Sequence, residues 1–211
     1  MRQIDYSKKV SDATLSMVGS SWRKMTHCDT PSGDMDVIYQ FVADNHPEKL
    51  IYAEGDSWFD KFTPIPNSRT NLLQEIRLPF KAAVVDVSTV GDESGDMVKG
   101  WQRWRTETLF KFYRFDAILL SAGGNDLKNL YADKLRKIKD GGVTSGEIAD
   151  MCRPATYQDY FNGVIKNIKE FVALRDNAGN DITRKAPILL HGYDYIQPRK
   201  AKAEIFSGGS L

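Results

Sequence analysis

The chain has 211 residues, of which 41% are hydrophobic and 27% are charged, and its formal net charge at pH 7 is +1. This length suits one domain with a core of its own and is short for two domains. The near-zero charge gives no reason to expect nucleic acid or an anionic membrane surface as a partner, and no apolar run approaches the roughly 20 residues of a membrane-spanning helix.

The first 47 residues predict a polar N-terminal extension, followed by the main domain over residues 48–211. Apolar residues recur at helical spacing over Val37–Val42 and indicate a short helix that packs on the main domain. The N-terminus lacks the apolar stretch of a secretory signal. This favours a cytoplasmic protein in which the two cysteines, Cys28 and Cys152, are reduced thiols.

Four apolar runs in the main domain have the length and composition of buried strands. They are Lys49–Ala53, Ala82–Val87, Phe115–Ser121 and Ala186–His191. Helical patterns separate these strands, at Asn71–Ile76, Met97–Tyr113 and Tyr157–Arg175. Strands that alternate with helices predict right-handed crossovers and a parallel sheet covered by helices on both faces. The expected fold class is therefore α/β.

The second of these helices is expected to pack on the sheet through its large apolar side chains. That face consists of Met97, Trp101, Trp104, Leu109 and Phe112.

A serine follows the first predicted strand, in the run Gly55-Asp56-Ser57. Open α/β sheets carry their ligand crevice at the carboxyl ends of the strands. A hydroxyl at that point can act as a nucleophile if a base and an oxyanion hole are brought to it. The tripeptide is also common at ordinary strand ends, where Ser57 would only cap the next helix.

Two later strands end in residues that could supply the oxyanion hole. Gly91 follows the second strand, where a glycine lets the backbone N–H approach an oxyanion with no side chain in the way. Asn125 follows the third strand, in Gly123-Gly124-Asn125-Asp126, and could direct its side-chain N–H at the same oxyanion. Each segment also fits a plain turn. Their order after consecutive strands, however, puts a hydroxyl and two donors at one edge of one sheet.

These three blocks resemble those of the SGNH hydrolases, also called GDSL esterases and lipases. The resemblance covers the chain from about Lys49 to Tyr195. It implies a flavodoxin-like fold and a serine hydrolase that acts on small-molecule carboxylic esters through an acyl-enzyme, with no cofactor and no metal. In this family's pattern Ser57 is the nucleophile, and Gly91 and Asn125 supply the oxyanion hole.

The family's fourth block, Asp-x-x-His near the C-terminus, has no counterpart here. The histidines are His27, His46 and His191, and none has an aspartate three residues before it. His191 ends the fourth predicted strand, at the correct edge of the sheet, where it fits either a base or a hydrogen-bonded packing residue.

The C-terminal segment Arg199–Leu211 indicates a loop, whereas a domain of this family ends in one more strand and a covering helix. The expectation is therefore a C-terminally incomplete hydrolase with little activity of its own. Its uncovered sheet edge would favour self-association, although the sequence does not specify an oligomeric state.

Two other functions are compatible with the sequence. A metal-assisted phosphoester hydrolase would gather Asp56, Asp92 and Asp126 around Mg²⁺ at the strand ends, and chelation would inactivate it. A non-catalytic binding module would keep the sheet and its crevice, and would bind a ligand without turning it over.

Overall fold

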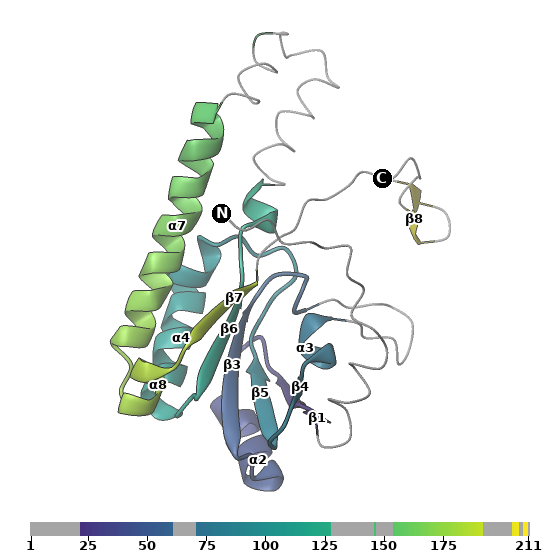
Figure 1. Ribbon diagram of the computed structural model, residues 1–211, viewed down its shortest axis with the longest axis vertical. Helices are drawn as coiled ribbons and strands as arrows, with labels where there is room; N and C mark the ends of the chain where they lie inside the picture. Colours follow the sequence, from purple (N-terminus) through teal and green to yellow (C-terminus); the bar gives the residue numbers. More distant parts are fainter. Residues whose placement is uncertain are drawn as a thin grey trace.

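The computed structural model describes residues 22–60, 71–127, 146, 154–191, 204–206 and 209–210. At its centre lies a five-stranded sheet in the order β2-β5-β3-β6-β7, and all of its strand pairs are parallel (Figure 1). The strands are β2 (Thr26–Asp29), β3 (Lys49–Gly55), β5 (Ala82–Asp86), β6 (Ala117–Ser121) and β7 (Ile188–His191). The last four are the predicted strands, and the α/β fold class is confirmed.

The helices agree with the predicted positions to within a few residues at their ends. The predicted ones are α2 (Met35–Asn45), α3 (Leu72–Glu75), α4 (Gly100–Phe112) and α7 (Pro154–Asp176), with a 3-10 turn, η1, at Asp96–Val98. The short α8 (Asp181–Lys185) was not predicted. None of the described helices combines the length and the apolar composition needed to cross a membrane.

Two pairs of short strands lie outside the main sheet. Strands β1 (Arg23–Lys24) and β4 (Arg77–Leu78) pair antiparallel, and so do β8 (Glu204–Phe206) and β9 (Gly209–Ser210). The second pair corrects the prediction of a strand-free C-terminal segment. A hairpin of such short strands needs no long apolar run, so the pattern that identified the buried strands did not detect it.

Alternate side chains of the sheet divide the core into two layers, as the two-residue period of a strand requires. From β3, Tyr52 packs with residues of α2, α4 and α7, whereas Ile51 and Ala53 pack on the opposite face with α3. The Tyr52 ring meets Phe110 and Phe115 edge-on, with centroids 4.9 and 5.3 Å away. Helices therefore cover both faces of the sheet, as Figure 1 shows for α4 and α7 on one side and α3 on the other.

The buried face of α4 agrees only in part with the predicted one, because Met97 in η1 and Leu109 are buried as predicted and the other three residues are exposed. Trp101, Trp104 and Phe112 are 53%, 57% and 63% exposed. The residues that α4 buries are Arg105, Thr106, Leu109 and Phe110. The prediction followed the largest apolar side chains. The structure instead turns Arg105 inward, because a carboxylate in β3 pairs with its charge.

Strand β2 adds residues of the predicted N-terminal extension to the main sheet. It runs parallel to β5, with Thr26 opposite Ala83 and Asp29 opposite Asp86. Its sequence, Thr-His-Cys-Asp, has no apolar alternation, and of its side chains only Cys28 is buried. Pairing with β5, rather than intrinsic strand preference, accounts for this element.

The topology identifies one place on the sheet edge at which open α/β sheets of this kind bind ligands. Apart from β2, the strand order is that of a flavodoxin-like sheet. The chain leaves β3 to form β5 on one side and later forms β6 on the other, so the topological switch point lies outside the carboxyl ends of β3 and β6. In register, Gly55 lies opposite Ser121, and Ser121 lies opposite His191. The ends of β3, β6 and β7 are therefore level with one another.

Candidate active site

Ser57 lies in the tight turn that follows β3. The backbone N–H groups of Phe59 and Asp60 both donate to the Asp56 carbonyl oxygen, at 2.9 and 3.0 Å. The Trp58 N–H donates to the Asp56 carboxylate at 3.1 Å. These bonds fix residues 56–60, which hold the half-buried Ser57 at the carboxyl end of its strand.

The loop after β5 lies against this turn. The Thr89 N–H donates to the Gly55 carbonyl oxygen at 2.9 Å, and the Val90 N–H donates to the Asp60 carboxylate at 3.3 Å. Gly91 comes next with φ = +94°, a backbone conformation that favours glycine. A Cβ at this position would meet nothing within 4 Å. The space beside Gly91 is therefore open, as the approach of a ligand to its backbone requires.

Side chains of the loop after β6 bind the loop after β5. Asn125 donates from Nδ2 to the Asp92 carbonyl oxygen at 3.0 Å. Asp126 accepts from the Ser94 N–H at 2.8 Å and from the Ser94 hydroxyl. One N–H of the Asn125 amide thus orients the side chain, and the amide carries a second N–H that a ligand can use. The loops that bear Ser57, Gly91 and Asn125 therefore form one connected network.

Helix α7 supports the third loop from outside. Tyr160 donates its hydroxyl to the Gly123 carbonyl oxygen. Burial, with the Asp126 carboxylate nearby, raises the pKa of Tyr160 to about 12. The phenol therefore keeps its proton at neutral pH and continues to donate. Gly123 itself has φ = +111°, which restricts this position to glycine without strain.

His191 lies at the same edge of the sheet, next to the serine turn. Its ring centroid is 5.3 Å from that of Trp58 and 6.5 Å from that of Phe59. Its Nδ1 is 3.3 Å from Ser121 Oγ, and Ser121 Oγ donates to Asp56 Oδ1 at 3.0 Å. Sequence reasoning missed Ser121, because a serine that ends a buried strand carries no signal until the strand register pairs it with both neighbours.

A buried ion pair lies directly behind the serine turn. Glu54 of β3 is fully buried and accepts from the Arg105 guanidinium, from the Tyr52 hydroxyl at 3.1 Å and from the Gly55 N–H at 3.2 Å. Burial raises the pKa of Glu54 to about 7, although Arg105 opposes this effect. The signal for this pair in the sequence is a carboxylate within an apolar strand, which needs a buried cation elsewhere.

The three aspartates of the metal-assisted alternative are held by separate partners. Asp56 and Asp126 accept from the serine hydroxyls described above, and Asp92 accepts from Gln102 Nε2 at 2.9 Å. Burial raises the pKa of Asp92 to about 6. Within the part of the chain that the structure describes, no group of three or more His, Cys, Asp or Glu side chains could hold a metal ion. This geometry gives the metal-assisted mechanism no support.

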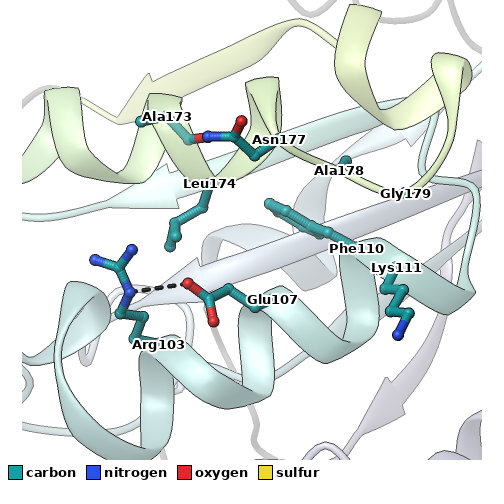
Figure 2. A pocket seen from close by; sticks show the side chains of 9 residues that line it. All are labelled: Arg103, Glu107, Phe110, Lys111, Ala173, Leu174, Asn177, Ala178 and Gly179. Atoms are coloured by element: carbon teal, nitrogen blue, oxygen red, sulfur yellow. Dashed lines mark hydrogen bonds and ion pairs between the residues drawn. The ribbon is translucent and has the colours of Figure 1, made fainter.

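A pocket of about 420 Å³ opens on the helical side of the molecule, between α4 and α7 (Figure 2). Phe110 and Leu174 line it, and Arg103 and Glu107 beside it form an ion pair at 2.9 Å. None of the predicted site residues lines this pocket. Arg103 and Glu107, which the dashed line in Figure 2 joins, bind each other. The pocket is therefore separate from the candidate site at the strand ends.

No protein-family model matches the chain, and no curated protein sequence matches it either. Among solved structures, it is similar to AlinE4, an SGNH-hydrolase family esterase, with a TM-score of 0.35 and 16% sequence identity. The match covers 67% of this chain and 57% of that one, so the matched part is little more than half of the esterase. A similarity of this size assigns no activity, which has to come from the residues themselves.

Proposed function

We propose that the protein is a serine hydrolase of the SGNH type that cleaves small-molecule carboxylic esters through an acyl-enzyme. The observation that supports this function is the hydrogen-bonded network that joins the loops bearing Ser57, Gly91 and Asn125 at one sheet edge. Acyl transfer needs a nucleophile and at least two donors for the oxyanion in one place. Ser57 is the nucleophile, and the Gly91 N–H and the Asn125 side chain are the donors.

In this mechanism Ser57 Oγ attacks the carbonyl carbon of the ester, and the electron pair of the C=O bond moves onto the oxygen. The serine proton passes to a base, which later delivers it to the departing alcohol. Water then attacks the acyl-enzyme in the same way and releases the acid. Each donor aimed at the oxyanion contributes a factor of about 10²–10³ to the rate.

A fluorophosphonate probe and a short acyl ester of p-nitrophenol test this function on the 211-residue chain. The probe should label Ser57, and Ser57→Ala should abolish both labelling and hydrolysis. Ser32→Ala, at an exposed serine in the loop before α2, is the matched control and should change neither. A chelator should also have no effect.

Other outcomes identify the competing functions. Hydrolysis of a phosphoester that is sensitive to a chelator and insensitive to Ser57→Ala would favour the metal-assisted enzyme. A wild-type chain that binds esters but neither hydrolyses them nor reacts with the probe at Ser57 would be a binding module, and the serine hydrolase would be refuted.

A further inference from the structure

We propose that His191 is the base that activates Ser57, and that Ser121 and Asp56 are positioning residues that hold its imidazole with the proton on Nδ1. This inference rests on the proposed function. It concerns the one part of the machinery for which the SGNH pattern has no counterpart in this chain.

The tautomer of His191 follows from the single proton of the Ser121 hydroxyl. Ser121 Oγ donates that proton to Asp56 Oδ1 at 3.0 Å. The same carboxylate oxygen accepts from the Trp58 N–H at 3.1 Å, so it acts as an acceptor for both. Ser121 Oγ therefore has no proton left for His191 Nδ1 at 3.3 Å and must accept there. The hydrogen sits on Nδ1, and Nε2 carries the lone pair that can take up a proton.

The chain of contacts from carboxylate to imidazole is built on rigid elements. Asp56 is 2% exposed and Ser121 is 0% exposed. Gly55, Ser121 and His191 are neighbours in register on three adjacent parallel strands. The sheet, rather than a loop of variable shape, thus sets the position of the imidazole, as a pre-organised base requires.

The imidazole lies against the turn that bears the nucleophile. The Trp58 and Phe59 rings, which contact it, belong to the two residues that follow Ser57. Carboxylate, hydroxyl and imidazole thus follow one another in space, and the imidazole contacts the two residues that follow Ser57 in the chain. With Ser57 as the group that His191 Nε2 serves, the proposal is a carboxylate–imidazole–serine arrangement with one hydroxyl inserted between the first two groups.

The other two histidines of the chain lie elsewhere. His46 caps the C-terminus of α2, before β3 begins, and His27 lies within β2 opposite Val84. Strand β2 is separated from β3 by β5. Neither residue ends a strand next to the serine turn, whereas His191 ends β7 opposite Ser121.

Ser57 and His191 are both neutral before the first proton transfer, and His191 is neutral again after the second. The Ser57 hydroxyl proton moves to His191 Nε2 while Oγ forms its bond to the carbonyl carbon. The resulting imidazolium keeps its Nδ1–H bond to Ser121, through which the Asp56 charge stabilises it. As the carbon–oxygen bond to the leaving group breaks, the Nε2 proton moves to the departing oxygen, and the imidazole is neutral again.

Labelling rates test the role of the base. His191→Ala should slow the reaction of Ser57 with the fluorophosphonate probe by about 10²–10⁴-fold, and imidazole added to the solution should restore part of the rate. Ser121→Ala should slow it by on the order of 10²-fold.

Ser88→Ala is the matched control for Ser121→Ala. Ser88 is 1% exposed, follows the neighbouring strand β5 and donates its hydroxyl to a buried aspartate, Asp86. A general loss of packing would affect both variants alike, whereas the proposed role predicts that only Ser121→Ala slows the labelling of Ser57 and changes the His191 tautomer.

Nitrogen-15 NMR of the imidazole rings tests the tautomer without any activity, with His191→Gln to assign the signal. The wild type should show a protonated Nδ1 and an unprotonated Nε2, and Ser121→Ala should lose this preference. A proton on Nε2 in the wild type would overturn the inference. Equal labelling rates for wild type and His191→Ala would refute the base and leave Ser57 as the nucleophile. A wild type that is never labelled at Ser57 would refute both proposals.

Discussion

Replacement of Arg105 by methionine tests the buried ion pair behind the serine turn. Arg105 is 2% exposed and Glu54 is 0% exposed, so water cannot replace the missing partner. Methionine keeps much of the apolar stem but removes the donors to Glu54 and to the Pro31 carbonyl oxygen. Loss of one partner of a buried pair typically costs 3–5 kcal/mol. We therefore expect the free energy of unfolding to fall by about 3–5 kcal/mol at pH 8.

The loss of stability should depend on pH, because Glu54 can be protonated. Burial raises its pKa from 4.5 to about 7 with Arg105 present, and removal of Arg105 raises it further. A carboxyl with a higher pKa in the folded state binds more protons there. Stability therefore falls as the pH rises from the unfolded-state pKa to the folded-state pKa.

This pH window differs between the two proteins. In the wild type the Glu54 contribution levels off above about pH 7. In Arg105→Met the fall continues above that pH, by up to about 1.4 kcal/mol per pH unit. The deficit of the variant is thus largest at pH 8 and shrinks toward pH 5.

Urea unfolding followed by tryptophan fluorescence at pH 5, 7 and 8 measures this deficit. Arg103→Met on the same helix is the control. Its pair with Glu107 spans 2.9 Å between side chains that are 45% and 48% exposed, so we expect it to cost less than about 1 kcal/mol. Introduced into Glu54→Gln rather than into wild type, Arg105→Met should cost the same free energy at all three pH values, because no carboxyl at position 54 titrates. A deficit for Arg105→Met that equals the control, or that is the same at pH 5 and 8, would refute the reasoning.

Three further predictions concern the backbone, the oxyanion hole and the sheet edge. Gly33→Ala should lower the free energy of unfolding by about 1–3 kcal/mol, because φ is +64° and a Cβ would meet a side chain of α4 at 2.6 Å. Gly163→Ala, in α7 with open space around it, should raise the free energy of unfolding by up to about 1 kcal/mol; thermal melts compare the two. Asn125→Ala should lower kcat by about 10²–10³-fold in the ester assay, and an unchanged kcat would remove it from the oxyanion hole. Leu189→Lys and Leu190→Lys, at side chains 57% and 48% exposed on β7, should reduce any self-association seen by sedimentation.

The fold was largely predictable, because its central strands are apolar runs and its helices carry periodic patterns. Strand β2 was not predictable in this way, since Thr26–Asp29 forms a strand only by pairing with β5. The buried face of α4 was mispredicted for a related reason. Whether Arg105 points inward depends on Glu54, which lies 51 residues away along the chain.

The candidate site shows the same difference between residues with a local sequence signal and residues placed by long-range pairing. Ser57, Gly91 and Asn125 could be proposed from the sequence because each lies in the segment that follows a predicted strand. Ser121 was not, because its two hydrogen bonds reach residues 65 and 70 positions away in sequence. A sequence motif contains residues that are close together in the chain. A group that orients them, such as Ser121, is brought to them by the register of neighbouring strands.

The pairing of β2 with β5 joins two segments that the ribosome synthesises at different times. Thr26 and Ala82, which the finished sheet joins by a hydrogen bond, are 56 residues apart. At about 5–20 residues per second, roughly 3–11 s pass between the synthesis of the two. During that time Met25 and Cys28, both buried in the folded protein, have no sheet to pack on. Strand β2 thus lacks its partner strand during this interval, and slower translation of residues 30–82 lengthens it.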